Sequence, residues 1–327
     1  MWTGSETYTS EPSSYNAKRY RRLQEPVRFR SGVLDYHLHL WPHGERHRTP
    51  TLEELAAYCE AAQAEGIEEI ALTEHLFRFA QADGPLSGHW SDADDDPRLE
   101  QQAADYWREH NGADLDEYVE TVLEAKAAGL PVVLGLEVDF YPHRMDKVRS
   151  LLEGYPFDVL LGSVHWIGAW LFDVLESAVA QDEWSNRGVD HAWDAYVRAL
   201  EELAGTGVVD VLAHPDLCKV AARWPSSGSF VDECHDRIAD AAARAGIAAE
   251  VSSAGWRKPC DEAYPAPSLL TKFRARGVPI TTASDAHSLD LVAYRAADLR
   301  PYVVAAGYDE VVAFRRRQPH RLPLAGA

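Results

Sequence analysis

Seven short apolar runs recur along the chain, each ending in polar residues. They are GVLDYHLH (residues 32–39), GIEEIALTEH (66–75), LPVVLGLEVDFY (130–141), FDVLLGSVHW (157–166), GVVDVLAHPD (207–216), GIAAEVSSAG (246–255) and GVPITTASDAH (277–287). Nearly continuous apolar runs of this length, rich in β-branched residues and leucine, are typical of strands buried on both faces. The pattern therefore predicts seven strands.

Segments rich in alanine, glutamate and leucine separate most of these runs. They predict helices over residues 51–65, 114–128, 145–153, 190–204, 230–245 and 267–276. Alternating strands and helices indicate an α/β fold with a parallel sheet covered by helices. Such a sheet can close into a barrel or lie open. Because polar residues follow nearly every strand, rather than meeting at one crevice, we expect a (β/α)7 barrel with the helices outside.

The remaining segments suggest a single domain with appendages. Residues 1–31 are polar and include the basic stretch AKRYRRLQ, so we expect a partly ordered N-terminal arm. The barrel is expected over 32–318 and a tail over 319–327. Residues 78–112 form an acidic and aromatic connection that is too long for an ordinary loop. This insertion is expected to be either a lid over the barrel or a surface feature without a role.

Composition narrows the function classes. The chain has 327 residues and a formal net charge of -20, which weighs against a duplex nucleic-acid partner. No apolar run approaches the roughly 18 residues of a membrane span, and the N-terminus lacks the pattern of a secretory signal. We therefore expect a cytoplasmic protein, while the oligomeric state stays open. The four cysteines are scattered without CxxC pairing, which argues against disulfides.

Imidazole and carboxylate groups lie at the ends of six of the seven predicted strands. They are His37, His39, Glu74, His75, Glu137, Asp139, His165, His214, Asp216, Asp285 and His287. These groups suit zinc, manganese or iron, and their number exceeds what one tetrahedral ion needs. Alternate strand residues face the same way, so His37 and His39 can reach one ion. Asp35 is expected either to orient a histidine ring or only to hydrogen-bond within the barrel.

The motifs DYHLHLWPHGE, LTEH, GLEVD, GSVHWIG, LAHPDL and SDAH, in this order and spacing, resemble the PHP (polymerase and histidinol phosphatase) domain family over about residues 33–290. The stretch AEVSSAGWRKP resembles the E-I-N-T-x-G-x-R-K segment of the histidinol-phosphate phosphatase branch, with Glu250, Ser253, Gly255, Arg257 and Lys258 in register. Ser252 replaces the usual asparagine.

This resemblance implies a distorted seven-stranded barrel that holds three divalent ions. The first ion would be held by His37, His39, Glu137 and Asp285, and the second by Glu137, His165 and His214. The third would be held by His75 and His287 with one further ligand. Glu45 fits the expected spacing best, and His43 and His47 are the alternatives.

The resemblance also implies a metal-dependent phosphomonoesterase, a hydrolase that converts histidinol phosphate to histidinol and phosphate through a metal-bridging hydroxide. The expected catalytic residues are Glu137, Asp285, His287 and Arg257, and the expected phosphate-binding residues are Arg257, Arg187, Lys258 and Ser253. The proton donor to the leaving group could be His287, Asp216 or a metal-bound water.

Three alternatives stay open at this point. The chain could hydrolyse another small phosphate ester or a nucleotide, serve as a non-catalytic metal-binding scaffold, or hydrolyse C–N bonds. The acidic residues Asp94, Asp95 and Asp96 of the insertion would favour a cationic amino-alcohol phosphate over a polyanionic nucleotide.

Overall fold

The computed structural model describes residues 33–42 and 49–324 of the chain. Within them, seven parallel strands pair in the order β1 (Leu34–Leu38), β2 (Glu69–Leu72), β3 (Val132–Asp139), β4 (Val159–Ser163), β7 (Val211–Leu212), β8 (Ala248–Ser252) and β9 (Ile280–Ala283). The segment after β9 returns to β1, where the His39 backbone N–H donates to the Ala286 carbonyl at 2.8 Å. The sheet is thus a nearly closed barrel, which confirms the predicted distorted (β/α)7 architecture.

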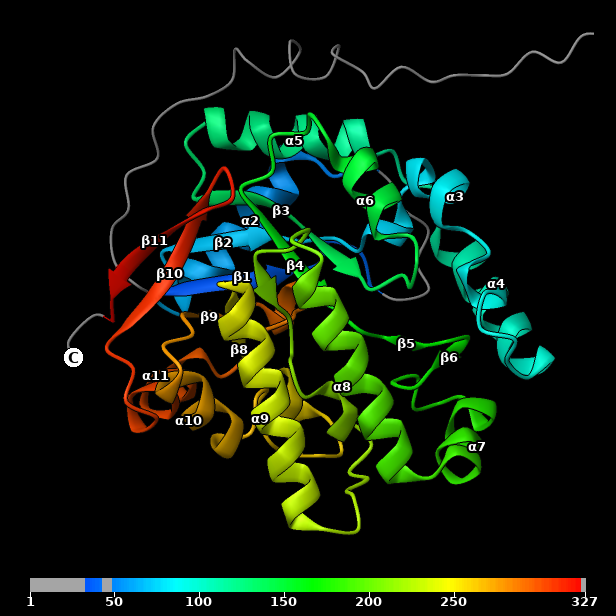
Figure 1. Cartoon of the computed structure of the whole chain (residues 1–327). Coiled ribbons are helices and arrows are strands. Elements are labelled where there is room, and N and C mark those ends of the chain that lie inside the picture. Colours follow the sequence, from blue (N-terminus) through cyan, green and yellow to red (C-terminus); the bar gives the residue numbers. More distant parts are fainter. Residues whose placement is uncertain (1–32, 43–48, 325–327) are drawn as a thin grey trace, which may run out of the picture.

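Helices surround this barrel (Figure 1). They are α2 (Leu52–Ala64), α5 (Leu115–Ala127), α6 (Met145–Leu152), α8 (Val189–Gly205), α9 (Gly228–Ala245), α10 (Pro267–Ala275) and α11 (Ala296–Ala305). The first six begin and end within two residues of the predicted bounds, whereas α11 was not predicted. Short 3-10 helices follow several strands: η2 (Leu76–Arg78), η4 (Leu217–Lys219), η5 (Ser253–Arg257) and η6 (Leu289–Leu291).

Local sequence explains where the helices begin. Thr51 and Glu54 form a reciprocal capping box at the start of α2. The Asp114 carboxylate accepts the backbone N–H groups of Asp116 and Glu117 at the start of α5. These side chains satisfy backbone donors that have no partner within the helix, and such caps typically stabilise a helix by about 1 kcal/mol.

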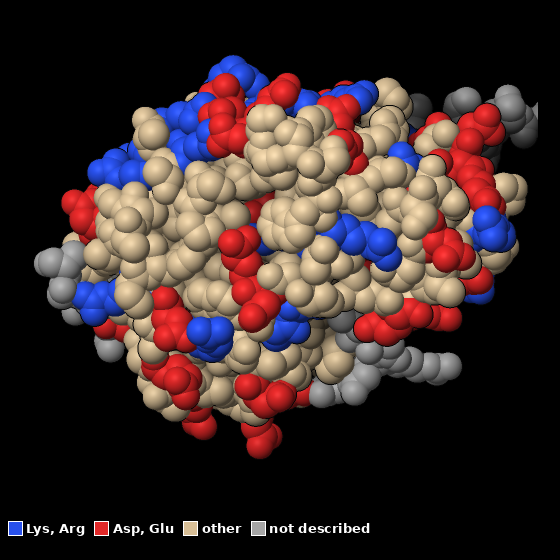
Figure 2. Space-filling view, turned by 90° about the horizontal axis from the view of Figure 1, so that it is seen from below, with Lys and Arg blue, Asp and Glu red and all other residues tan. Residues whose placement is uncertain are grey.

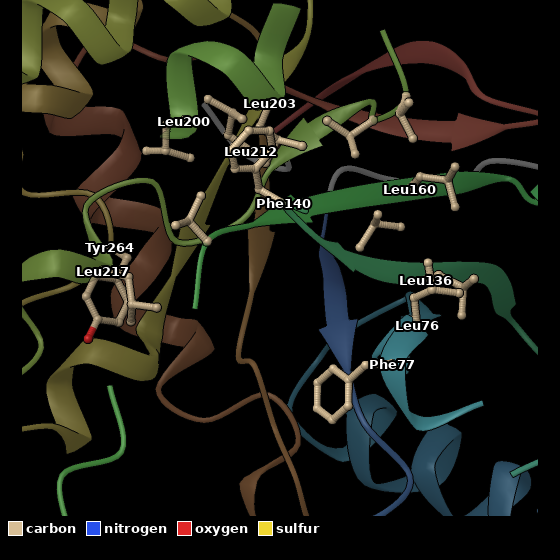
Figure 3. Close-up of a cluster of buried hydrophobic side chains, with 14 of the residues drawn as sticks. Leu76, Phe77, Leu136, Phe140, Leu160, Leu200, Leu203, Leu212, Leu217 and Tyr264 are labelled. Carbon is tan, nitrogen blue, oxygen red and sulfur yellow. The ribbon is translucent and has the colours of Figure 1, made fainter. Parts of the chain in front are cut away.

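The main hydrophobic core lies between the strands and the helices. In Figure 3, Leu200 and Leu203 of α8 lie beside Leu212 of β7. Leu136 of β3 and Leu160 of β4 belong to the same cluster. A second cluster joins residues of the barrel strands to the C-terminal part of the chain. Burial on this scale supplies the main favourable term for folding and fixes where each strand ends.

A C-terminal hairpin covers the amino-terminal end of the barrel. It consists of β10 (Glu310–Arg315) and β11 (Gln318–Pro323). Arg315 pairs with Glu69, the first residue of β2. Arg317 pairs with Asp210, directly before β7, at 2.9 Å. The segment expected to be a tail from residue 319 therefore lies largely in β11, because the β10 backbone offers it a partner.

The insertion at residues 78–112 forms α3 (Ala80–Leu86), η3 (His89–Ser91) and α4 (Pro97–His110). It packs against a small hairpin of β5 (Trp166–Ile167) and β6 (Trp170–Leu171), which leads into α7 (Ala178–Arg187). The Asp95 carboxylate accepts the Ala169 backbone N–H at 2.7 Å and pairs with Arg187 at 2.8 Å. These contacts fix the insertion to the hairpin as a wall.

Acidic and basic side chains are interspersed on the face shown in Figure 2. The four cysteines Cys59, Cys218, Cys234 and Cys260 are free thiols, as expected. In residues 33–42 and 49–324, every helix is too short or too polar to cross a lipid bilayer.

Candidate metal centre

The carboxyl ends of the strands bring the predicted ligands together. His37 lies in β1 and Glu137 in β3. The others follow strands: His39 follows β1, His75 follows β2, His165 follows β4, His214 follows β7, and Asp285 and His287 follow β9. Asp285 and His214 have φ angles of 51° and 27°, in the left-handed region that side chains with a Cβ rarely adopt. Such strained backbone is concentrated at functional sites, where the surrounding structure maintains it.

Glu137 lies at the centre of this cluster, and its two carboxylate oxygens face different groups. Oε2 lies 2.8 Å from His75 Nδ1, 3.2 Å from His37 Nε2 and 3.4 Å from His39 Nε2. Oε1 lies 3.0 Å from His214 Nε2 and 3.6 Å from His165 Nε2. A carboxylate placed in this way can be shared between two ions.

Asp285 and His287 complete the other side of the centre. Asp285 Oδ1 lies 3.6 Å from His39 Nε2 and 3.8 Å from His37 Nε2. The ring of His39 stacks with two other imidazole rings. Its centroid lies 4.1 Å from that of His287 and 4.3 Å from that of His75. Three overlapping groups could each hold an ion: His39, His75 and His287; His37, His39 and Glu137; and His75, Glu137 and His165.

Buried carboxylates orient three of the histidine rings. Glu250 Oε2 lies 2.7 Å from His37 Nδ1, Asp139 Oδ1 lies 2.7 Å from His165 Nδ1, and Glu74 Oε2 lies 3.5 Å from His39 Nδ1. Each of these rings therefore directs its Nε2 atom toward Glu137. Such outer partners fix the ring orientation of metal-binding histidines. Sequence reasoning gave Glu250 no such role, although the strand-end pattern had marked Glu74 and Asp139.

Asp35 does not support the histidine rings, although that was one of its two expected roles. Its carboxylate accepts the Ser284 backbone N–H at 2.8 Å, the Ser284 hydroxyl at 2.6 Å and the Ala293 backbone N–H at 2.9 Å. Burial raises its pKa to about 6, against these hydrogen bonds, which lower it. Asp35 thus joins β1 to the segment that follows β9, the same segment that carries Asp285.

The electrostatics of the cluster favour a cation. Burial opposes the charge of Glu137, but His75, His37 and His165 hold its pKa well below the usual value. Burial also opposes protonation of His165, while Asp139 and Glu137 raise its pKa to about 10. In the described part of the chain, His37 Nε2, His39 Nε2 and Glu137 Oε2 are buried and have no hydrogen-bond partner. These atoms fit divalent metal ions, which accept imidazole and carboxylate ligands.

A cavity of about 340 Å³ opens onto this centre. Glu137, His75, His165, His214, Asp285 and His287 form its polar end. Aromatic and aliphatic side chains form much of the remaining wall, including Phe77, Tyr106, Trp166, Leu171, Val174 and Tyr264. The insertion contributes Tyr106 and the β5–β6 hairpin contributes Trp166, so both segments shape the space next to the centre. None of Asp94, Asp95 and Asp96 is among the cavity-lining residues.

The four residues expected to bind phosphate lie in different surroundings. Lys258 lines the cavity and is exposed. Arg257 donates to the backbone carbonyls of Ser284 and Asp285, the first at 2.8 Å. Arg187 pairs with Asp95 and Glu183, and Ser253 is buried with its hydroxyl 3.5 Å from the Ala283 carbonyl. The structure therefore brings Lys258 to the cavity, and it engages the other three with protein groups.

Two further expectations concern positions near the centre. Glu45, His43 and His47, the candidates for the ninth ligand, lie outside the described residues. Asp216 is fully buried, and its Oδ2 atom accepts the Ala266 backbone N–H at 2.7 Å and pairs with Lys219 at 2.9 Å. These contacts tie η4 to the segment before α10.

The fold and site define a (β/α)7 barrel with a buried metal centre of histidines and carboxylates at the carboxyl ends of its strands. The family model of the PHP domain matches residues 37–254. The chain therefore belongs to the PHP domain family.

Two kinds of relatives extend this result. The chain is 32% identical over 291 residues to a probable histidinol-phosphatase of Deinococcus radiodurans, covering 88% of this chain and 98% of that protein. The fold is similar to histidinol phosphate phosphatase from Lactococcus lactis, solved with zinc, L-histidinol and phosphate, with a TM-score of 0.64, 20% identity and coverage of 88% and 99% of the two chains. A putative histidinol phosphatase of Listeria monocytogenes gives a TM-score of 0.62, 19% identity and coverage of 81% and 99%.

Proposed function

We propose that this protein is a metal-dependent phosphomonoesterase that hydrolyses histidinol phosphate to histidinol and phosphate. The observation that carries the proposal is the position of Glu137, with five imidazole nitrogens within 3.6 Å of its two oxygens. The similarity to a probable histidinol-phosphatase over almost the whole of that relative supports the choice of substrate. The cavity beside Glu137 supplies room for a small phosphate ester.

The ligand set supports three ions. His37, His39, Glu137 and Asp285 would hold the first, and Glu137, His165 and His214 the second. His75 and His287 would hold the third, and His39 lies close enough to contribute to it. Zinc, manganese and iron all accept these ligands. When bound, such ions activate water as a nucleophile and neutralise charge on phosphoryl oxygens.

Two of the protein's own cationic residues would help to position the ester. Lys258, at the cavity wall, can contact a phosphate oxygen as a mobile cation. Arg257 would act indirectly, by holding the backbone of Asp285 in its left-handed conformation. His287 would hold the third ion and Asp216 is engaged with Lys219, so neither side chain is available to donate a proton to the leaving alkoxide.

A phosphate-release screen tests this proposal directly. Protein purified without chelator is assayed with histidinol phosphate, nucleoside monophosphates and sugar phosphates, and its metal content is measured by mass spectrometry. We expect the highest kcat/KM for histidinol phosphate and about three ions per chain. Release from a nucleotide in preference to histidinol phosphate would refute the substrate, and metal-free protein with full activity would refute the mechanism.

A further inference from the structure

The cavity contains two carboxylates that the metal centre does not use, Asp173 and Glu176. Both lie in the segment between β6 and α7. Asp173 is half-buried and makes no hydrogen bond or ion pair with the described residues, while Glu176 is exposed at the rim. An unpaired carboxylate that is partly withdrawn from water costs free energy, so its presence in a cavity requires an explanation.

The surroundings of Asp173 strengthen its electrostatic field. Trp166, Leu171 and Val174 line the same cavity, and apolar walls reduce the screening of a charge by water. A positively charged group that enters the cavity would therefore be attracted to Asp173.

The nature of the walls favours an organic cation over a further metal ion. Apart from the centre itself, the lining offers no histidine near Asp173, and its neighbours in the chain are Phe172 and Val174. The rings of Phe77, Tyr106 and Trp166 also line the cavity. Aromatic faces attract ammonium and planar cationic groups, whereas a divalent ion needs several polar ligands.

A second observation points to a ligand with two different ends. Glu137 lines the same cavity, and its Oε2 atom is buried without a hydrogen-bond partner in the described residues. Lys258 also lines the cavity. A ligand that fills this space would meet an anion-binding end at the metal centre and a cation-binding end at Asp173.

We infer that Asp173 binds the ammonium group of an amino-alcohol phosphate and so selects cationic phosphate esters over neutral or anionic ones. Glu176, at the rim, adds negative charge along the entry path. This inference rests on the proposed function for its substrate, but it assigns the selection to a residue outside the metal centre. The acidic residues that sequence analysis connected with a cationic substrate lie instead in the insertion, where Asp95 is already paired with Arg187.

The variant Asp173→Asn tests the inference, because it retains the shape of the side chain and removes its charge. A hydrogen bond to a charged group contributes about 1.5–3 kcal/mol, so kcat/KM for histidinol phosphate should fall roughly 10–100-fold, mainly through KM. The value for p-nitrophenyl phosphate, which carries no cation, should stay within about twofold. The matched control is Asp182→Asn, which removes one charge from the exposed side of α7, outside the cavity.

Equal losses on both substrates, or an unchanged KM for histidinol phosphate, would overturn the inference. Calorimetric binding of L-histidinol to metal-loaded protein adds a measurement that requires no turnover. We expect weaker binding in Asp173→Asn and unchanged binding in Asp182→Asn. If the wild-type protein releases phosphate from no ester, the proposed function fails, while a selective loss of histidinol binding in Asp173→Asn would still support the cation site.

Discussion

Glu250 shows how a residue outside the cavity controls the metal centre. It is fully buried, and its two oxygens contact His37 Nδ1 at 2.7 Å and the His214 backbone N–H at 3.1 Å. One carboxylate thus orients two predicted metal ligands from strands far apart in the sheet.

Replacing Glu250 with glutamine should weaken metal binding without abolishing it. Outer partners of metal ligands typically contribute 10–100-fold to affinity, so we expect a loss of that order in a metal titration. Activity should recover at higher metal concentration, because the ligands themselves remain. Glu124→Gln on the exposed side of α5 is the control. Activity that stays low at saturating metal would show that Glu250 acts in another way.

A second prediction concerns the buried residue His89 and the pH dependence of stability. It is 5% exposed and surrounded by the rings of Trp90, Trp107, Tyr141 and Trp166. Burial, aided by Arg144, lowers its pKa to about 3. Between pH 6.5 and 3 the unfolded chain therefore binds a proton at this position that the folded chain does not, and stability falls as the pH falls.

The expected loss of folding stability follows from the same difference in proton binding between the folded and unfolded chain. At pH 5 the loss from His89 is about 2 kcal/mol relative to pH 7. Denaturant unfolding at both pH values measures it, with His89→Phe as the comparison, since Phe removes the titrating group and keeps an aromatic ring. The variant should lose less stability than the wild type on acidification. Equal losses in the two proteins would contradict the prediction.

The sequence predicted most of the residues that cluster around Glu137, because each lies in or shortly after a strand of recognisable pattern. The contacts of Glu250 with His37 and of Asp35 with Ser284 could not be read from it, since the two residues of each pair lie more than 200 positions apart in the chain. Asp173 was missed for another reason. It lies in an irregular turn after a two-residue strand, where no periodicity shows which way a side chain points.

At the scale of elements, the position of η5 depends on the close packing of its backbone at Gly255 against the backbone at Glu262. A Cβ at Gly255 would lie 1.9 Å from the Glu262 carbonyl oxygen, so only glycine fits there. This turn carries Arg257 and precedes Lys258, and its position therefore affects the rim of the cavity.

Gly255→Ala should destabilise the protein by about 1–3 kcal/mol, because either η5 or the segment at Glu262 must move. Thermal unfolding measures the loss. Gly228→Ala, at the start of α9, is the matched control, since a Cβ there meets nothing within 4 Å. Equal melting temperatures for Gly255→Ala and the wild type would exclude the clash.

The six predicted helices agree closely with the structure because each has a buried apolar face that repeats with the helical period, and α2 and α5 also begin with a side-chain cap. Two of the elements that were missed, α3 and β11, have weak local signals. α3 begins at Ala80 without a side-chain cap and contains Pro85. β11 is mostly exposed, so its polar sequence shows no alternation, and only its pairing with β10 makes it a strand.

At the scale of the whole molecule, the metal centre connects strands from both ends of the barrel sequence. β1 and the segment after β9 both contribute proposed ligands, and their buried imidazole and carboxylate groups favour cation binding. Bound ions should therefore stabilise the closed barrel as well as the site.

Adding zinc or manganese to chelator-treated protein should raise the melting temperature. Binding to the folded state alone contributes about 2.7 kcal/mol when free metal is 100 times the dissociation constant. Calorimetry at several metal concentrations measures the shift, and Glu137→Gln should show a much smaller one. A melting temperature independent of metal in the wild type would argue against a metal centre of this kind.

The hairpin at the amino-terminal end of the barrel has a consequence for protein synthesis. Arg315 contacts Glu69, 246 positions earlier, and the Phe314 backbone N–H donates to the Tyr36 hydroxyl, 278 positions earlier. Contacts between such distant positions form slowly, and on the ribosome they must wait until the later partner has emerged. The nascent barrel therefore stays open at this end until the hairpin has been synthesised, a period in which chaperones would have access to its strands.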